Sequence, residues 1–254
     1  MHDKEVITVI FGGSSGIGAS LTLGLAEYGH TVIPVSRTKF KVNNIVQELD
    51  KRGLKHLGEI TADITKYNEI ESVLKKVLDN FGRVNNLINS AGAFVKKETV
   101  SITEDEWQEV IDVNLKGTFL TCQIFGKNMI KEGNGGSIVN IASLGAHRGL
   151  LETSPYCASK GGVLLLTKSL AVEWAKYNIR VNCISPGVFE TPLNKQALAI
   201  PERRKRIISR TPMGRIGNTS ELVGAAIFLT SSDLSAFVTG ITIPVDGGFL
   251  AWGF

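Results

Sequence analysis

Residues 6–18 read Val6-Ile7-Thr8-Val9-Ile10-Phe11-Gly12-Gly13-Ser14-Ser15-Gly16-Ile17-Gly18, an apolar run followed by a glycine-rich turn. The apolar, β-branched run predicts a strand buried on both faces, as in a parallel sheet. The amphipathic stretch from Ala19 to Tyr28 predicts a helix directly after the turn. Because glycines lack side chains, phosphate groups can approach the backbone N–H groups at the start of that helix. The stretch therefore predicts a strand–turn–helix unit able to hold a phosphate-bearing ligand.

The rest of the chain continues this pattern. A second predicted strand covers Thr31 to Ser36, and short apolar runs then alternate with longer amphipathic ones. This alternation is typical of βαβ units, so we expect an α/β fold. The 254 residues show no linker, low-complexity block or internal repeat. With 43% hydrophobic and 20% charged residues the chain can bury a large core, and we expect a single domain over residues 1–254.

Composition argues against several classes of protein. The net charge of +4 is mild, and basic residues are scattered apart from the run 203–206, so nucleic-acid binding is not expected. No apolar run reaches the roughly 18 residues of a membrane span. The polar start, Met1 to Glu5, argues against a signal peptide. We therefore expect a cytoplasmic protein without a membrane partner.

The cysteines and most histidines lie outside the motifs described below. Cys122, Cys157 and Cys183 are an odd number and widely spaced, which favours buried thiols over disulfides or a metal site. No metal is predicted. His2, His30 and His56 are expected to be structural or solvent-facing.

The end of the second predicted strand bears on the choice of cofactor. In a dinucleotide-binding unit this position lies beside the adenosine ribose, where an acidic residue holds a 2′-hydroxyl group and a basic one accepts a 2′-phosphate. The chain reads Ser36-Arg37-Thr38-Lys39 there, without an acid. The planar guanidinium of Arg37 suits a phosphate, so NADP(H) is favoured and NAD(H) remains possible.

A phenol, an ammonium and a hydroxyl group are predicted to meet later in the chain. Tyr156 and Lys160 lie one helical turn apart, and Ser143 follows the apolar run Ser137 to Ala142. A positive charge near a phenol lowers its pKa from the usual ~10. The Ser143 hydroxyl can hold a substrate oxygen on which charge develops. The trio predicts a proton-transfer site for an alcohol or carbonyl, although the Tyr–Lys pair alone is too common to be decisive.

Five motifs occur in one order along the chain. They are Gly12-x-x-x-Gly16-x-Gly18, Asn89-Ser90-Ala91-Gly92, Asn114, Ser143 with Tyr156-x-x-x-Lys160, and Pro186-Gly187. Together they resemble the short-chain dehydrogenase/reductase family along nearly the whole chain. The resemblance implies a single-domain Rossmann fold, with a doubly wound parallel seven-stranded sheet in the order 3-2-1-4-5-6-7 and helices on both faces. It also implies a homotetramer.

The resemblance implies a role for each catalytic motif residue. Tyr156 would be the acid and base, Ser143 would polarise the substrate oxygen, and Lys160 would lower the tyrosine pKa and bind the nicotinamide ribose. Asn114 would hold a water for proton relay. The residues expected at the cofactor are Gly12, Ser14, Ser15, Gly16, Ile17, Gly18, Ser36, Arg37, Asp63, Ile64, Asn89, Ala91, Gly92, Tyr156, Lys160, Pro186, Gly187, Val188 and Thr191.

One further residue matches the family pattern at the adenine end of the cofactor, and two residues near the glycine turn depart from that pattern. Asp63, after the predicted strand Leu57 to Ala62, matches the family's aspartate that contacts the adenine amine. Phe11 stands where the family usually has a threonine, so a hydroxyl that would tie the turn to the Asn89 segment is missing. Ser90 replaces a second asparagine and lacks the amide's paired donor and acceptor. Both changes leave the geometry of the turn open.

The substrate pocket is expected between two segments. One is the connection from Ser143 to Tyr156, and the other is residues 188–213, which resemble the family's mobile substrate flap. A basic run in the flap, 203–206, could attract an anionic substrate or form a solvated helix face. Solvated loops also carry polar residues without touching any substrate. The candidate substrate contacts are His147, Arg148, Glu152 and Phe189.

Residues 211–217 and 245–249 are most similar to family members that act on sugars and sugar acids, such as gluconate 5-dehydrogenases. The leading interpretation is an NADP(H)-dependent oxidoreductase that interconverts a secondary alcohol and a ketone, on a small-molecule sugar acid or polyol. A 3-oxoacyl thioester reductase acting on acyl-carrier-protein conjugates is the alternative enzyme. A cofactor-binding scaffold without turnover is the alternative from a different functional class, that of proteins that are not enzymes.

Overall fold

A computed structural model describes residues 5–192 and 194–252. Within these ranges the chain forms one seven-stranded parallel sheet in the order β3-β2-β1-β4-β5-β6-β7. The order reverses between β1 and β4, as in a doubly wound sheet. The strands are β1 (Ile7–Phe11), β2 (Thr31–Ser36), β3 (Ile60–Thr61), β4 (Asn86–Asn89), β5 (Gly136–Ile141), β6 (Ile179–Pro186) and β7 (Thr242–Val245).

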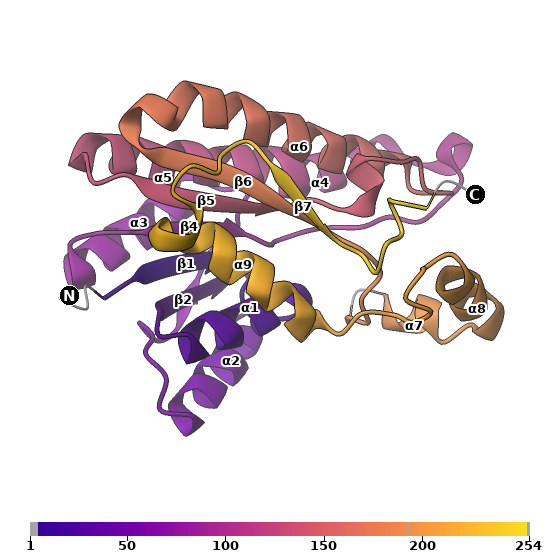
Figure 1. The fold of residues 1–254 in the computed structure, drawn as a ribbon, viewed down its shortest axis with the longest axis horizontal. Helices are drawn as coiled ribbons and strands as arrows, with labels where there is room; N and C mark the ends of the chain where they lie inside the picture. Colours follow the sequence, from indigo (N-terminus) through magenta and orange to yellow (C-terminus); the bar gives the residue numbers. More distant parts are fainter. Residues whose placement is uncertain (1–4, 193, 253–254) are drawn as a thin grey trace.

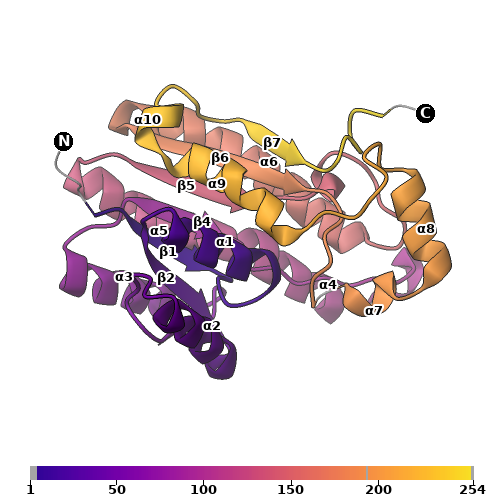
Figure 2. The same cartoon turned by 60° about the horizontal axis from the view of Figure 1, so that its bottom comes forward.

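Helices cover both faces of the sheet (Figures 1 and 2). One layer contains α3 (Tyr67–Phe81), α4 (Glu104–Ile111), α5 (Gly117–Glu132) and α6 (Ser154–Trp174). The other contains α1 (Gly16–Glu27), α2 (Lys39–Lys51) and α9 (Val223–Thr230). A π-helical turn over Asp112–Lys116 joins α4 to α5. The short helices are α7 (Lys195–Leu198), α8 (Pro201–Ser209), α10 (Ser232–Ser235) and four 3₁₀ turns, Thr99–Ser101, Leu144–Ala146, Ala175–Tyr177 and Thr219–Leu222.

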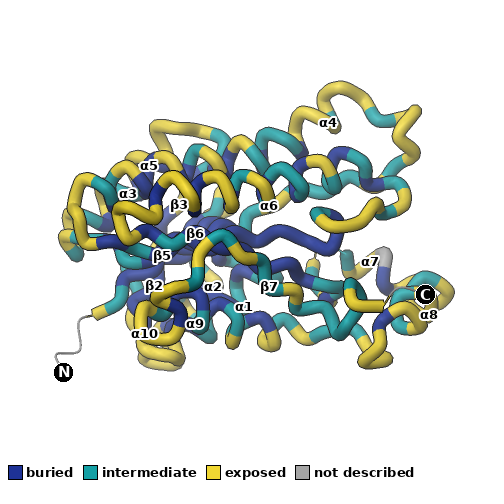
Figure 3. Tube along the Cα trace, turned by 45° about the horizontal axis from the view of Figure 1, so that its top comes forward, coloured by how far each residue is buried: buried dark blue, intermediate teal, exposed yellow. Residues whose placement is uncertain are grey.

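Two apolar clusters hold these layers to the sheet. One packs Phe125 of α5 and Trp174 of α6 against the strands, and the other packs Leu21 and Leu25 of α1 with Leu229 of α9. Strands β1, β2, β4, β5 and β6 are buried along most of their length, whereas the outer helix faces are exposed (Figure 3). Burial on both faces explains why the strands read as continuous apolar runs. No described helix is long and apolar enough to span a membrane.

The predicted fold class and strand order are confirmed, and the element boundaries differ most in two places. The strand expected over Leu57 to Ala62 is reduced to Ile60–Thr61, because Gly58 adopts a left-handed φ of 89° that interrupts the extended backbone. Helix α1 begins at Gly16 rather than Ala19, so the last glycines of the turn form its first turn. This places their backbone N–H groups at the helix N-terminus.

Residues 188–217 leave the sheet after β6 and return to their starting point. The Gly217 N–H donates to the Val188 carbonyl over 3.0 Å, and Phe189 forms an isolated β-bridge with Gly217. Between these two ends lie α7 and α8, at the end of the sheet toward which the strand arrows point (Figure 1). The segment is therefore closed at its base, beside the carboxyl ends of the strands.

Candidate active site

The glycine turn after β1 is held by contacts that leave no room for side chains. The Gly12 N–H donates to the Val35 carbonyl over 2.8 Å, and the Ser14 hydroxyl donates to the Ser36 hydroxyl over 2.7 Å. A Cβ at Gly12 would lie 2.4 Å from the backbone nitrogen of Ala91, and one at Gly18 would lie 2.0 Å from the Gly12 carbonyl oxygen. Two of the motif glycines are thus required by close backbone packing.

A cleft of about 480 Å³ runs along the carboxyl ends of the strands. Its floor is the glycine turn, and it extends from the end of β2 to the start of α6. The predicted residues that line it are Gly12, Ser14, Ser15, Gly16, Ile17, Gly18, Ser36, Arg37, Ile64, Ala91, Gly92, Ser143, Tyr156, Lys160, Pro186, Gly187, Phe189 and Thr191.

Tyr156, Lys160 and Ser143 meet in this cleft, as their spacing predicts. Buried Lys160 donates from Nζ to the Ile141 carbonyl over 2.7 Å, and its Nζ lies 5.9 Å from the centroid of the Tyr156 ring. Ser143, the second residue after β5, is also buried, and its Oγ accepts from the Gly145 N–H over 3.1 Å. The end of β5 thus fixes the lysine, while the first turn of α6 presents the phenol.

Burial is the largest influence on the ionisation of this trio. It raises the pKa of Tyr156 above its ordinary value, while a hydrogen bond with Ser143 acts in the lowering direction. Burial also lowers the pKa of Lys160 to about 8. The prediction of a lowered Tyr156 pKa is therefore wrong in this structure. Desolvation disfavours the phenolate, and the charge of Lys160 is not among the influences that shift this pKa.

Asn114 lies behind the cleft and does not line it. Its Oδ1 accepts from the Ala93 N–H over 2.7 Å, and its Nδ2 donates to the Ala93 carbonyl over 3.0 Å and to the Ser159 hydroxyl over 2.9 Å. The neighbouring Phe94 ring packs edge-on against Tyr156, with 5.0 Å between ring centroids. Asn114 thus connects the loop after β4 to the helix that carries Tyr156.

Asn89 also lies behind the cleft, in a buried polar network. Its Nδ2 donates to Asn140 Oδ1 over 2.9 Å, and its Oδ1 accepts from the Thr121 hydroxyl over 2.8 Å. Phe11 and Ser90, the two residues that depart from the family pattern, lie beside this network. Phe11 packs edge-on against Phe125, with 5.9 Å between ring centroids. The Ser90 N–H donates to the Phe11 carbonyl over 2.8 Å, so a backbone hydrogen bond joins the end of β1 to the Asn89 segment.

Arg37 and Asp63 lie at the other end of the cleft. Arg37 lines it, with its side chain 59% exposed and Nη1 3.9 Å from the Asp63 carboxylate. Asp63 does not line the cleft, because its carboxylate accepts from the N–H and hydroxyl of Thr65 over 2.9 and 2.8 Å. No acidic residue lines the cleft beside Ser36 among the described residues.

Comparison with known proteins identifies the family that has this arrangement. A family model described as enoyl-(acyl carrier protein) reductase matches residues 12–250. A 2-dehydro-3-deoxy-D-gluconate 5-dehydrogenase of Escherichia coli is 36% identical over 245 residues, 96% of this chain and 95% of that protein. A 3-oxoacyl-(acyl-carrier-protein) reductase of Thermotoga maritima is 38% identical over 251 residues, 98% of this chain and 100% of that protein. The chain belongs to the short-chain dehydrogenase/reductase family.

A solved structure of the family extends the comparison. It is a gluconate 5-dehydrogenase from Burkholderia cenocepacia in complex with NADP and tartrate, with a TM-score of 0.91 and 33% identity. The match covers 98% of this chain and 96% of that one. With relatives named as dehydrogenases and reductases over nearly its full length, this short-chain dehydrogenase/reductase is an oxidoreductase that acts on CH–OH or keto groups.

The cleft fits the dinucleotide that these enzymes use. A Cβ at Gly16 would project to 3.4 Å from Thr191 Cβ, so a side chain there would fill the cleft, and its φ of 53° already favours glycine. The Ser15 side chain does not cap α1, and the described first turn contains no acid. The N–H groups that begin this helix are therefore available to phosphate oxygens.

The predicted substrate contacts do not converge on the cleft. Only Phe189 lines it. His147 bonds through Nε2 to the Ser185 hydroxyl over 2.9 Å, and Arg148 donates to the Leu250 carbonyl over 3.0 Å. Glu152, with a left-handed φ of 62°, pairs with Lys96, which lowers the pKa of its carboxyl group. His147 thus bonds to β6, whereas Arg148 and Glu152 join neighbouring loops. Val188, expected at the cofactor, lines a second cavity of about 370 Å³ behind Phe189.

Several residues that line the cleft were missed by the sequence reasoning. Most are apolar strand ends or loop residues without a motif, but Lys41 carries a charge and follows Arg37 in the basic run Arg37-Thr38-Lys39-Phe40-Lys41. That run was the available signal. The missed residues are Phe11, Val35, Thr38, Lys41, Ala62, Ser90, Val113, Ile141, Ala142, Pro192 and Asn194.

The cysteines and His30 also have defined positions. Cys122 and Cys183 are buried, as expected, whereas Cys157 is half-buried. His30 is buried and its Nδ1 bonds to the Thr8 hydroxyl over 2.9 Å. Among the described residues, no three His, Cys, Asp or Glu side chains cluster closely enough to hold a metal ion.

Proposed function

We propose that this enzyme interconverts a secondary alcohol and a ketone on a sugar acid, with NADP(H) as cofactor and Tyr156 as acid and base. The observation that carries the proposal is the meeting of Tyr156, Ser143 and Lys160 in one cleft with the glycine turn. The relatives that act on gluconate derivatives support the substrate class. Bound in the cleft, the nicotinamide would supply or accept the hydride.

The protein's part is proton transfer and charge stabilisation. Tyr156 donates its phenolic proton to the substrate oxygen in reduction and takes it back in oxidation. Ser143 donates a hydrogen bond to the same oxygen as negative charge develops on it. Lys160, held by the Ile141 carbonyl, keeps a positive charge beside the phenol and the ribose position. Asn114 lies behind the cleft and positions the loop and helix beside Tyr156 through its hydrogen bonds to Ala93 and Ser159.

Arg37 supports the preference for NADP(H). Its guanidinium is exposed at the end of β2, and its nearest carboxylate is 3.9 Å away, longer than a direct hydrogen bond. It can therefore turn toward a 2′-phosphate without losing a strong partner. A cofactor with a free 2′-hydroxyl would instead favour an acid at the strand end.

A 3-oxoacyl thioester reductase is the second candidate. The Thermotoga maritima reductase is as similar to this chain as the gluconate relatives are. The basic residues of α8, on the segment beside the cleft, suit either a sugar-acid carboxylate or an acidic carrier protein. A scaffold without turnover would have no chemical use for the Tyr156, Ser143 and Lys160 arrangement.

Nicotinamide absorbance on the purified protein tests the proposal. Gluconate, 5-keto-gluconate, glycerol and acetoacetyl thioesters would each be tried with NADP(H) and with NAD(H). We expect turnover of the sugar acids with NADP(H) at higher kcat/KM than the thioesters. A preference for acetoacetyl thioesters would favour the second candidate, and no turnover of any substrate by a protein that binds NADPH would favour the scaffold.

A further inference from the structure

Lys41 lies at the adenosine end of the cleft and belongs to no motif. It is the third residue of α2 and lines the cleft together with Ser36, Arg37 and Thr38. Its side chain is exposed, like that of Arg37. Its position on a helix, rather than on the loop of Arg37, fixes where its ammonium group can reach.

The charges around Lys41 are not balanced. Arg37 has Asp63 at 3.9 Å, and Lys39 has Glu59 at 3.4 Å. Lys41 has no acidic side chain within 4.0 Å among residues 5–192 and 194–252, and the described first turn of α2 contains no acid. This end of the cleft therefore has an excess of positive charge.

We propose that Lys41 is a second determinant of cofactor choice, which binds the 2′-phosphate of NADP(H) together with Arg37. The inference rests on the proposed use of NADP(H). A phosphate monoester carries between one and two negative charges at neutral pH and three acceptor oxygens, more than a single guanidinium can neutralise. Arg37 offers a planar fork to two oxygens, and Lys41 offers a compact charge to the third.

Lys41 thereby discriminates between the two nicotinamide cofactors. NAD(H) has a neutral hydroxyl group at the 2′ position, which offers no counter-ion to Lys41, whereas Arg37 keeps Asp63 at 3.9 Å. Charge-assisted hydrogen bonds of this kind typically change affinity by about 10- to 100-fold. The effect on binding should therefore appear only with ligands that carry the 2′-phosphate, and should weaken as salt rises.

Calorimetric titration with two cofactor fragments tests the proposal without catalysis. Adenosine 2′,5′-bisphosphate and adenosine 5′-monophosphate differ only in the 2′-phosphate. Lys41→Ala should weaken binding of the bisphosphate about 10- to 100-fold and leave the monophosphate within about twofold. Lys41→Arg should keep most of the bisphosphate affinity. Lys39→Ala, which removes a neighbouring lysine outside the cleft, should change neither ligand.

The outcomes separate this inference from the proposed function. If the unaltered enzyme binds the bisphosphate no more tightly than the monophosphate, the NADP(H) preference and the role of Lys41 both fail. If it prefers the bisphosphate and Lys41→Ala binds as well as the unaltered enzyme, only the role of Lys41 is overturned. Equal weakening of both ligands by Lys41→Ala would also overturn it, because the cleft as a whole would then have changed.

Discussion

The Asn114 amide forms two hydrogen bonds with Ala93, accepting through its oxygen and donating through its nitrogen. The same nitrogen also donates to the Ser159 hydroxyl. The amide is buried, and each of its hydrogen bonds reaches the loop or helix beside Tyr156. A proton relay through this side chain would have to share atoms that already hold the site together. At the scale of single residues, the polar groups behind the cleft position those that face it.

His30 gives the protein a pH-dependent stability. Burial lowers its pKa from 6.5 to about 4, so between these values the unfolded chain binds a proton that the folded chain does not. The free energy of unfolding should therefore fall as pH drops from about 6.5 to 4, with no further loss from this group below that. Denaturant titrations from pH 7 to 4 measure the slope.

A His30→Gln variant provides the control. Glutamine can keep a hydrogen bond to the Thr8 hydroxyl but has no proton to gain in this range. The variant should lose stability more gently with acid than the unaltered protein does. Identical slopes in the two proteins would mean that His30 contributes nothing to the acid sensitivity.

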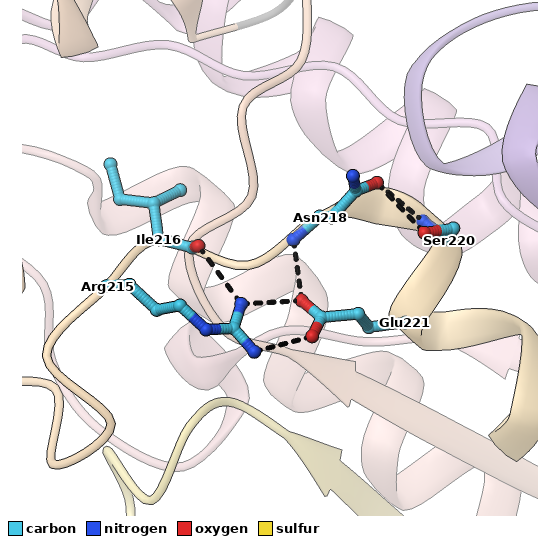
Figure 4. Close-up of polar contacts among 5 residues, drawn as sticks. All are labelled: Arg215, Ile216, Asn218, Ser220 and Glu221. Carbon is cyan, nitrogen blue, oxygen red and sulfur yellow. Dashed lines mark hydrogen bonds and ion pairs between the residues drawn. The ribbon is translucent and has the colours of Figure 1, made fainter.

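At the scale of elements, the segment 188–217 depends on the anchor at its end. The Arg215 guanidinium makes two hydrogen bonds, of 2.8 and 2.6 Å, to the Glu221 carboxylate, which also accepts from the Asn218 N–H over 2.7 Å (Figure 4). These bonds lower the pKa of Glu221 to about 2, so the pair stays charged at neutral pH. Between Arg215 and Asn218 lies Gly217, which forms an isolated β-bridge with Phe189, just after β6.

Gly217→Ala should disturb the site through Phe189. The added Cβ would lie 2.4 Å from the Phe189 ring, which lines the cleft, so the ring or the bridge must move. We expect a loss of about 1–3 kcal/mol in unfolding free energy, together with a raised KM for the substrate. Thermal unfolding and steady-state kinetics measure the two effects.

Gly224→Ala is the matched control for that substitution. Gly224 lies in α9, and a Cβ there would meet nothing within 4 Å. It should be neutral or stabilising by up to about 1 kcal/mol, with unchanged KM. If both glycine variants behave alike, the β-bridge at Gly217 does not position the cleft.

The sequence predicted these elements unevenly, for physical reasons. The meeting of Tyr156, Ser143 and Lys160 could be predicted, because strand ends and helical spacing are local in the chain, whereas the sheet order was implied by the family resemblance. Lys41 could not be ranked above Lys39, because the two differ only in which side of α2 meets the cleft. The partners of the loop residues could not be predicted for a related reason. Arg148 lies near the site, but its partner, Leu250, is distant in the sequence.

At the scale of the whole molecule, we propose the homotetramer that the family resemblance implies. Exposed apolar side chains on α4, α5 and α6 support it. Leu165 and Val172 are seven residues apart on α6, which places them on one face, and they are 66% and 83% exposed. Trp107 of α4 and Phe119 of α5 are also exposed. Exposed apolar groups of this kind are typical of interfaces between subunits.

Leu165→Glu with Val172→Glu should shift the protein to a smaller species. Two carboxylates would have to be buried, and charges are depleted from the centre of protein interfaces. Light scattering measures the mass. Asn44→Glu with Gln47→Glu adds the same charge on exposed polar positions of α2, and should leave the mass unchanged. An unaltered mass for the α6 variant would exclude this face from the interface.

We propose that Tyr156 transfers the proton, and the turnover of Tyr156→Phe tests this role directly. NADPH formation from gluconate would be followed in both proteins, with adenosine 2′,5′-bisphosphate titrated in parallel. We expect kcat to fall by about 10²- to 10⁴-fold with unchanged bisphosphate affinity, because only the phenolic oxygen and its proton are removed. If the variant binds the bisphosphate normally and retains most of its turnover, Tyr156 is not the proton donor.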